Sequence, residues 1–108
     1  MILVEVYEDK QGRITGYEVS GHSGYAEEGS DIICSAISAL TQAPLHGMTK
    51  HLKIKPSWHV NQEDGYLKVA LDSAPTDLTE AILRTMVLGV ASIERQCPEY
   101  VRIQEHRR

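Results

Sequence analysis

Two side chains in the first third of the chain, those of His22 and Cys34, could together perform nucleophilic chemistry. A cysteine is a useful nucleophile only as its thiolate, and a nearby imidazole can take the thiol proton. The segment between them, residues 23–29, contains two glycines and is expected to form a loop. A thiol and an imidazole joined by such a loop would suit acyl transfer.

The residues after this loop predict a helix that carries Cys34 in its first turn. Ser30 is a good N-cap, and the negative charge of Asp31 complements the dipole at a helix start. Backbone amides that are unpaired at the start of a helix favour negative charge on the sulfur. The same amides could bind the oxyanion of a tetrahedral intermediate. The predicted helix start therefore meets several needs of acyl transfer at once.

Each of these residues also has a purely structural explanation. A lone cysteine beside an apolar stripe is usually a small core residue, and this applies to Cys34. Gly21 and Gly24, on either side of the histidine, are also typical of a plain turn. Asp31 could be only a helix-start charge. Ser38, one turn after the cysteine, could hydrogen-bond near the sulfur or be only a half-exposed helix serine.

The loop between the two residues is expected to act as a lid over a bound substrate, although ordinary solvated loops have similar sequences. A glycine-bearing loop before a helix can also bind an anion without any chemistry. This loop carries acidic residues and no Lys or Arg, which disfavours phosphate binding. The lid residues are Ser23, Gly24, Tyr25, Ala26, Glu27, Glu28 and Gly29.

The remaining histidines and the second cysteine predict no metal site and no cofactor. His46 and His51 are off the spacing that places two ligands on one helix face, and His59 is expected on the polar side of a strand. A zinc site that combines one of them with His22 and Cys34 has no motif behind it. The second cysteine, at a predicted helix end, is expected to be structural.

Length and charge limit the class of protein. The chain of 108 residues has room for one domain, so residues 1–108 are expected to form a single cysteine-peptidase domain. Its 11 Lys and Arg against 15 Asp and Glu give a net charge of −4, which disfavours nucleic-acid binding. The first residues do not resemble a signal peptide, and no apolar run suits a membrane span. We therefore expect a cytoplasmic protein with reduced thiols.

The hydrophobic pattern predicts an α+β domain with the element order ββαββαβ, built on a mixed or antiparallel five-stranded sheet with two main helices. Pro44 is expected to kink or end the first helix at Ala43, and a further helical piece over residues 45–52 is uncertain. Strands are expected over residues 2–7, 13–20, 56–61, 66–72 and 100–104, and helices over 30–43 and about 77–96.

The last helix is apolar on more than one side, which predicts a second buried surface such as a homodimer interface. Its expected core stripe includes Leu78 and Ile82, and Val87 and Val90 lie beside it. Replacing Val87 or Val90 with aspartate is expected to shift a dimer toward monomer.

Residues 21–40 resemble the signature of the bacterial ribosomal-processing cysteine protease family. A pattern of this length with His, Asp and Cys in register is far more specific than an isolated His and Cys. The matching positions are Gly21, His22, Gly24, Tyr25, Ala26, Gly29, Asp31, Ile32, Cys34, Ala36, Ser38 and Leu40.

The resemblance implies a cytoplasmic cysteine endopeptidase that removes the N-terminal extension of a large-subunit ribosomal protein in support of ribosome assembly. It implies a dyad of His22 as base and Cys34 as nucleophile, a homodimer, and a mobile loop between the two residues that orders on peptide. It implies no direct contact with nucleic acid or membrane. The alternative is a non-catalytic ribosome-associated module that uses the same glycine-rich loop for docking.

Overall fold

A computed structural model describes residues 1–21 and 30–107 of the chain. It confirms the predicted α+β class and the element order ββαββαβ. The strands are β1 (Ile2–Glu8), β2 (Ile14–Ser20), β3 (Ser57–Asn61), β4 (Tyr66–Ala70) and β5 (Val101–Arg107). The helices are α1 (Ser30–His46), which continues into the π-helical turn η1 (Gly47–His51), and α2 (Asp77–Gln96).

The five strands form one mixed sheet in the order β3-β4-β2-β1-β5. All neighbouring pairs are antiparallel except β1 and β5, which run parallel. Strands β3 and β5 therefore have free outer edges. The sheet order, which local sequence patterns leave open, places the β3–β4 hairpin next to β2 instead of at the far side of β1.

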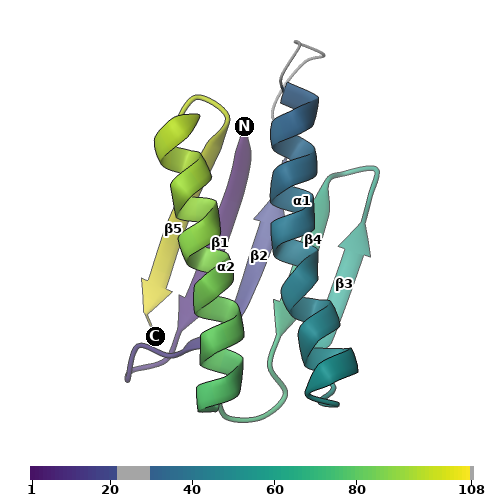
Figure 1. The fold of residues 1–108 in the computed structure, drawn as a ribbon, viewed down its shortest axis with the longest axis vertical. Coiled ribbons are helices and arrows are strands. Elements are labelled where there is room, and N and C mark those ends of the chain that lie inside the picture. Colours follow the sequence, from purple (N-terminus) through teal and green to yellow (C-terminus); the bar gives the residue numbers. More distant parts are fainter. Residues whose placement is uncertain (22–29, 108) are drawn as a thin grey trace.

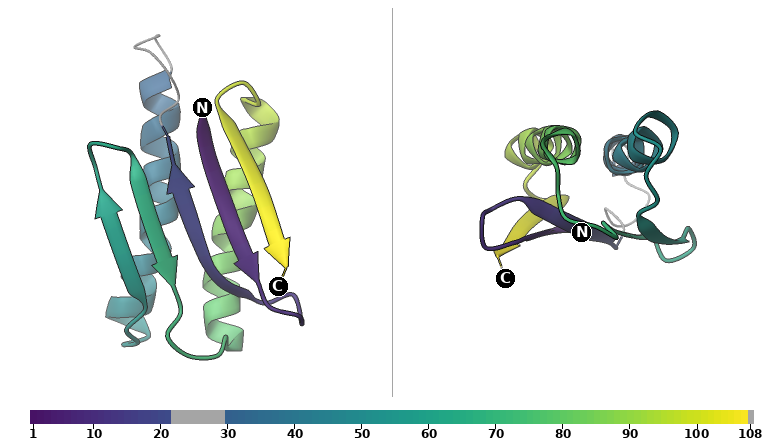
Figure 2. Two further views of the ribbon diagram at one scale, coloured as in Figure 1. Left: turned by 180° about the vertical axis from the view of Figure 1, so that it is seen from behind. Right: turned by 90° about the horizontal axis from the view of Figure 1, so that it is seen from below.

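Both helices lie on the same face of the sheet, and the other face carries no helix (Figure 2). Alternating residues of the central strands point toward the helices, as a half-buried strand requires. The buried side chains of this face include Val4, Val6, Tyr17, Val19 and Val69. They pack against helix residues such as Ile37, Leu83, Met86 and Val90 to form the core.

Of the two outcomes predicted for Pro44, a kink or an end at Ala43, the end is wrong, because α1 runs through Pro44 to His46. A proline inside a helix removes one backbone hydrogen bond and disturbs the turn before it. In that preceding turn the carbonyl oxygen of Thr41 accepts a hydrogen bond of 2.5 Å from the buried Tyr17 hydroxyl. The carbonyl that lacks the donor of residue 44 is that of Leu40, so the Tyr17 bond holds the adjacent residue of the weakened turn to the sheet. Residues 45–52 remain helical up to His51.

Helix α2 corrects two further predictions. Leu78 is not in the core, because 63 % of its surface is exposed. Val87 and Val90 are buried against the sheet, so they cannot form a second interface, and aspartate at either position would disrupt the core instead of dissociating a dimer. The outward apolar residue of this part of α2 is Leu88, which is 64 % exposed.

None of the helices in the described ranges combines the length and the apolar character that crossing a membrane requires.

Candidate functional site

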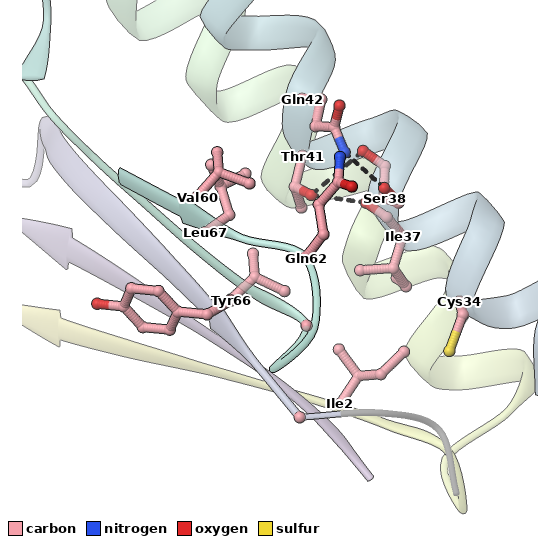
Figure 3. A pocket seen from close by; sticks show the side chains of 13 residues that line it. Ile2, Cys34, Ile37, Ser38, Thr41, Gln42, Val60, Gln62, Tyr66 and Leu67 are labelled. Atoms are coloured by element: carbon pink, nitrogen blue, oxygen red, sulfur yellow. Dashed lines mark hydrogen bonds between the residues drawn. The ribbon is translucent and has the colours of Figure 1, made fainter. Parts of the chain in front are cut away.

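A groove of about 280 Å³ lies between the N-terminal half of α1, the ends of β1 and β2, and the tip of the β3–β4 hairpin. Figure 3 shows that Cys34 projects from α1 toward this space, opposite Ile2 of β1. The thiol is half-buried and packs at the margin of the core. The candidate nucleophile therefore lies on a concave surface that is open to a ligand. Because α1 begins at Ser30, Cys34 stands at the start of the second turn and not in the first turn as predicted.

Gly21 closes the groove at the end of β2, directly before the predicted base. Its φ of +89° lies in the region that favours glycine, and a Cβ added there would overlap the carbonyl oxygen of Met1. No other residue fits this position without strain. Gly21 thus ends the strand beside the N-terminal residues and fixes where the following segment begins.

His22 and the loop residues 23–29, which were predicted as base and lid, lie outside the described residues. Asp31 belongs to the first turn of α1, as predicted, and its side chain is likewise not described. The structure therefore describes the predicted nucleophile, Cys34, and the backbone at the two ends of the predicted lid, Gly21 and Ser30. The dyad of His22 and Cys34 stays a prediction.

Ser38 lies in the same groove as Cys34 but hydrogen-bonds elsewhere. Its hydroxyl oxygen accepts a hydrogen bond of 2.6 Å from the Gln42 side-chain amide, one turn further along α1. Thr41 is buried, and its hydroxyl donates a hydrogen bond of 2.8 Å to the Ile37 carbonyl oxygen. The floor of the groove thus combines an apolar residue, Ile37, with polar groups that already have partners within the helix.

The β3–β4 hairpin contributes lining residues that the sequence did not point to, among them Val60 and Gln62. Their side chains face the same space as Cys34 in Figure 3. The alternation of Trp58 and Val60 predicts an apolar strand face, but it does not reveal that α1 leaves this face partly open. Strand order was needed to bring the hairpin to the cysteine.

On the open face of the sheet, Glu18 accepts hydrogen bonds from the hydroxyls of Tyr66 at 2.5 Å and Tyr7 at 3.0 Å. The Tyr66 hydrogen bond is the main reason why the pKa of Glu18 is lowered, and the same bond raises the pKa of Tyr66 to about 12. Tyr66 also borders the groove, but Figure 3 shows its hydroxyl pointing away from Cys34, and the cluster tethers β4 to β2. We interpret it as structural.

Within the described ranges, no three His, Cys, Asp or Glu side chains are grouped so that they could hold a metal ion. Cys97 is the C-cap residue of α2, and its amide donates to the Ile93 carbonyl at 2.8 Å; the structural role of its side chain stays a prediction. His59 packs against Tyr66, with ring centroids 5.9 Å apart, on the polar side of the hairpin as expected.

One curated relative and two solved structures are similar to this chain. The ribosomal processing cysteine protease Prp of Staphylococcus aureus (strain Mu50 / ATCC 700699) is 24 % identical over 103 residues, which cover 95 % of this chain and 97 % of the relative. The S. aureus Prp structure with a substrate peptide has a TM-score of 0.89 at 23 % identity, covering 97 % of this chain and 99 % of that one. Its complex with a covalently linked product peptide has a TM-score of 0.88 at 24 % identity, with coverage of 97 % and 99 %.

The similarity to solved structures supports the fold, including the placement of the cysteine-bearing helix on the sheet. A family model described as "Cysteine protease Prp" matches residues 1–102, which is nearly the whole chain. The resemblance in residues 21–40 is therefore part of a match along the full length of the fold. The chain belongs to the cysteine protease Prp family.

Proposed function

We propose that this protein is a cytoplasmic endopeptidase that removes the N-terminal extension of a large-subunit ribosomal protein before ribosome assembly, with Cys34 as nucleophile and His22 as general base. Residues 1–108 would act as one cysteine-peptidase domain. The observation that carries the proposal is the position of the Cys34 thiol, in a groove whose rim is formed by Gly21, the residue directly before His22. The net charge of −4 suits a basic ribosomal substrate.

The reaction follows from the chemistry of a thiol and an imidazole. His22 takes the proton of Cys34, and the sulfur forms a bond to the carbonyl carbon of the peptide. The C–N bond then breaks as His22 returns the proton to the leaving amine. Water attacks the resulting thioester, His22 accepts its proton, and the C–S bond breaks to restore the thiol. Backbone amides in the first turn of α1 stabilise the oxyanion.

The direct test is incubation with the extended ribosomal protein, followed by intact-mass analysis. Cys34→Ala should lower the cleavage rate on the order of 10³-fold or more, because the covalent step is lost. His22→Gln should lower it by about 10²- to 10⁴-fold. Cys97→Ala is the matched control and should cleave like the parent. Full activity of Cys34→Ala would overturn the proposal.

Alkylation separates catalysis from simple docking. Cys34 and Cys97 are both half-buried, so exposure alone predicts similar rates of reaction with iodoacetamide. An activated Cys34 should react faster than Cys97 by about tenfold or more, because the thiolate is the reacting species. Equal rates, together with tight binding and no cleavage, would instead favour the non-catalytic docking module.

We also propose a homodimer, in which the outer face of α2 contributes the interface. This face exposes Leu78 and Leu88, and a partner that covered the face would remove both apolar side chains from water. Light scattering coupled to size exclusion should give a dimer for the parent and a smaller mass for Leu88→Asp. A monomeric parent protein would contradict the assignment.

A further inference from the structure

The two free edges of the sheet differ in chemistry. The edge strand β5 carries the charges of Arg102, Glu105 and Arg107 along its length. The other edge strand, β3, has the sequence Ser-Trp-His-Val-Asn and carries no Lys, Arg, Asp or Glu, although all of its residues are exposed. Charges on an edge strand prevent unwanted pairing with another chain. Strand β3 lacks this protection, so its free backbone groups are open to an added strand.

Two large apolar side chains stand on the same strand. Trp58 and Val60 pair with Val69 and Leu67, whose side chains are buried beneath the helices. They therefore point to the helix side of the sheet, but Trp58 remains 58 % exposed and Val60 38 % exposed. Helix α1 does not extend over them. An exposed tryptophan beside an exposed valine is the type of surface that carries binding energy when an apolar side chain covers it.

The edge is continuous with the groove of Cys34. Val60 and Gln62, at the end of β3, line that groove together with the thiol. Figure 3 shows both side chains facing the same space as Cys34, so a chain that lies in the groove can continue along the free edge of β3. The strand is long enough for about five residues, or roughly 16 Å of extended peptide.

We propose that an extended segment of the peptide substrate pairs with the outer edge of β3 as an additional strand and places an apolar side chain against Trp58 and Val60. This inference rests on the proposed function and specifies how its substrate is held. Main-chain hydrogen bonds hold the peptide, and every second side chain of the peptide faces Trp58. Peptides that add a strand to the edge of a sheet are recognised in this way. The lack of charge on β3 agrees with recognition by backbone and apolar contact.

Trp58 provides a direct readout, because it is the only tryptophan in the chain. Cys34→Ala protein is titrated with substrate peptides that lack tryptophan, and binding is followed in parallel by calorimetry. One peptide keeps about three residues on each side of the cleaved bond. Of the two longer peptides, one adds about five residues on the N-terminal side of this core and the other adds about five on the C-terminal side. We expect a saturable blue shift of Trp58 emission with one of the longer peptides. Calorimetric binding of both longer peptides without any change in emission would overturn the inference.

Kinetics with the active protein give a second measurement. The longer peptide that shifts the emission should have a kcat/KM about tenfold above that of the short one, and Trp58→Ala should remove this advantage. Lys10→Ala, which truncates an exposed side chain in the turn between β1 and β2, outside the groove and the proposed dimer face, should keep it. In the parent protein, N-methylation of the added segment should lower kcat/KM at alternate amides only, because every second amide points toward β3. An advantage that persists in Trp58→Ala, or methylation effects without alternation, would contradict strand pairing.

The outcomes separate this inference from the proposed function. If the parent cleaves all peptides but shows none of the expected dependence on Trp58, the protease proposal stands and strand addition fails. If no peptide is cleaved but the emission still shifts, the edge binds peptide and the protease proposal fails. An emission shift that depends on protein concentration without peptide would show that a second copy of the chain occupies the edge, and this would overturn the inference.

Discussion

Helices α1 and α2 lie side by side on one face of the sheet, but they are attached to it in different ways (Figure 1). Helix α2 is tied down along its whole length. Thr76 and Thr79 form a reciprocal capping box at its start. In its second turn Arg84 bonds Glu8 of β1 at 2.8 Å, and near its end Glu94 accepts from the Ile103 amide of β5 at 2.9 Å.

Helix α1 is held mainly at its middle. Ile37 is buried in the core, and Tyr17 reaches up from β2 to the carbonyl of Thr41. The start of α1, which carries Cys34, adjoins the groove instead of a second layer of structure. Helix α2 is therefore the more firmly anchored of the two, whereas α1 carries the proposed nucleophile, Cys34. Four changes test this division, and they are given in order of decreasing expected effect.

The largest loss of stability is expected for Arg84→Met. The Glu8 side chain is almost fully buried, and Arg84 donates to it as well as to Glu80 and to the carbonyl oxygen of Gly12. The pKa of Arg84 is raised, chiefly by its hydrogen bond to Glu8. Removing the guanidinium leaves the buried Glu8 carboxylate with only the largely exposed Arg107, at 4.0 Å, as a charged partner. The change should lower the free energy of unfolding by about 2–4 kcal/mol.

Urea unfolding measures this loss, and Arg13→Met is the matched control. Arg13 pairs with Asp77 at the start of the same helix, but that pair is largely exposed and should contribute less than about 1 kcal/mol. Equal losses of unfolding free energy in the two variants would show that the buried Arg84–Glu8 pair holds α2 no better than the exposed Arg13–Asp77 pair. The difference in attachment between α2 and α1 would then be smaller than described.

A smaller loss of unfolding free energy is expected for Tyr17→Phe, which removes a hydrogen bond between the sheet and α1. Burial raises the pKa of the Tyr17 hydroxyl, and its hydrogen bond to Thr41 is the polar link between the sheet and this helix. The change should cost about 1–2 kcal/mol, because the carbonyl of Thr41 loses its outside donor. Amide exchange should accelerate in α1 more than in α2. Uniform acceleration in both helices would contradict separate attachment.

Thr76→Ala should cost about 1 kcal/mol, because the side-chain oxygen that accepts from the Thr79 amide is lost. The effect should appear as faster amide exchange in the first turn of α2, with peptide cleavage unchanged. Thr76→Ser retains the hydroxyl and should behave like the parent. Reduced cleavage in Thr76→Ala at a temperature where it is fully folded would mean that α2 also takes part in the chemistry.

The smallest effect is expected on the open face, which neither helix covers. The pKa of Glu18 is lowered in the folded protein, so its contribution to stability is present above the ordinary value of 4.5 and is lost as the pH falls through the folded value. Tyr66→Phe should therefore cost less than about 1 kcal/mol at pH 7, and the cost should shrink toward pH 3. Urea unfolding at the two pH values measures it.

At high pH the sign is reversed. The pKa of Tyr66 is raised to about 12, so its protonated hydroxyl stabilises the fold below pH 10, and this contribution is lost as the pH rises through about 12. A difference between parent and Tyr66→Phe that grows toward acid pH would contradict the hydrogen bond as the cause.

Local features were predicted well because they depend on neighbouring residues. The two strands of the β3–β4 hairpin, the helix over residues 77–96 and the position of Cys34 on a helix all follow from short patterns, and the structure confirms them. The sequence predicted that the last strand ends at residue 104, because the polar residues 105–107 do not resemble a strand. Pairing of these residues with β1 extends β5 to Arg107.

Features that depend on distant partners could not be predicted. Pro44 ends a helix in isolation, but the Tyr17 hydroxyl lies below the preceding turn only once the sheet has formed. The apolar stripe of α2 could be predicted from the sequence pattern, whereas the exposure of the Leu78 side chain depends on where the sheet ends. For the site, Cys34 followed from a local pattern, but Val60 reaches the groove only through the strand order.

The tight packing of Gly21 against Met1 has a practical consequence for fusion proteins. The chain begins at the groove, where Ile2 also contributes to the lining, and β5 ends at the opposite end of the sheet (Figure 1). An affinity tag fused before Met1 would crowd the groove, whereas a tag at the C-terminal end would extend away from it. Kinetic comparisons of the variants described above are therefore best made with C-terminal tags.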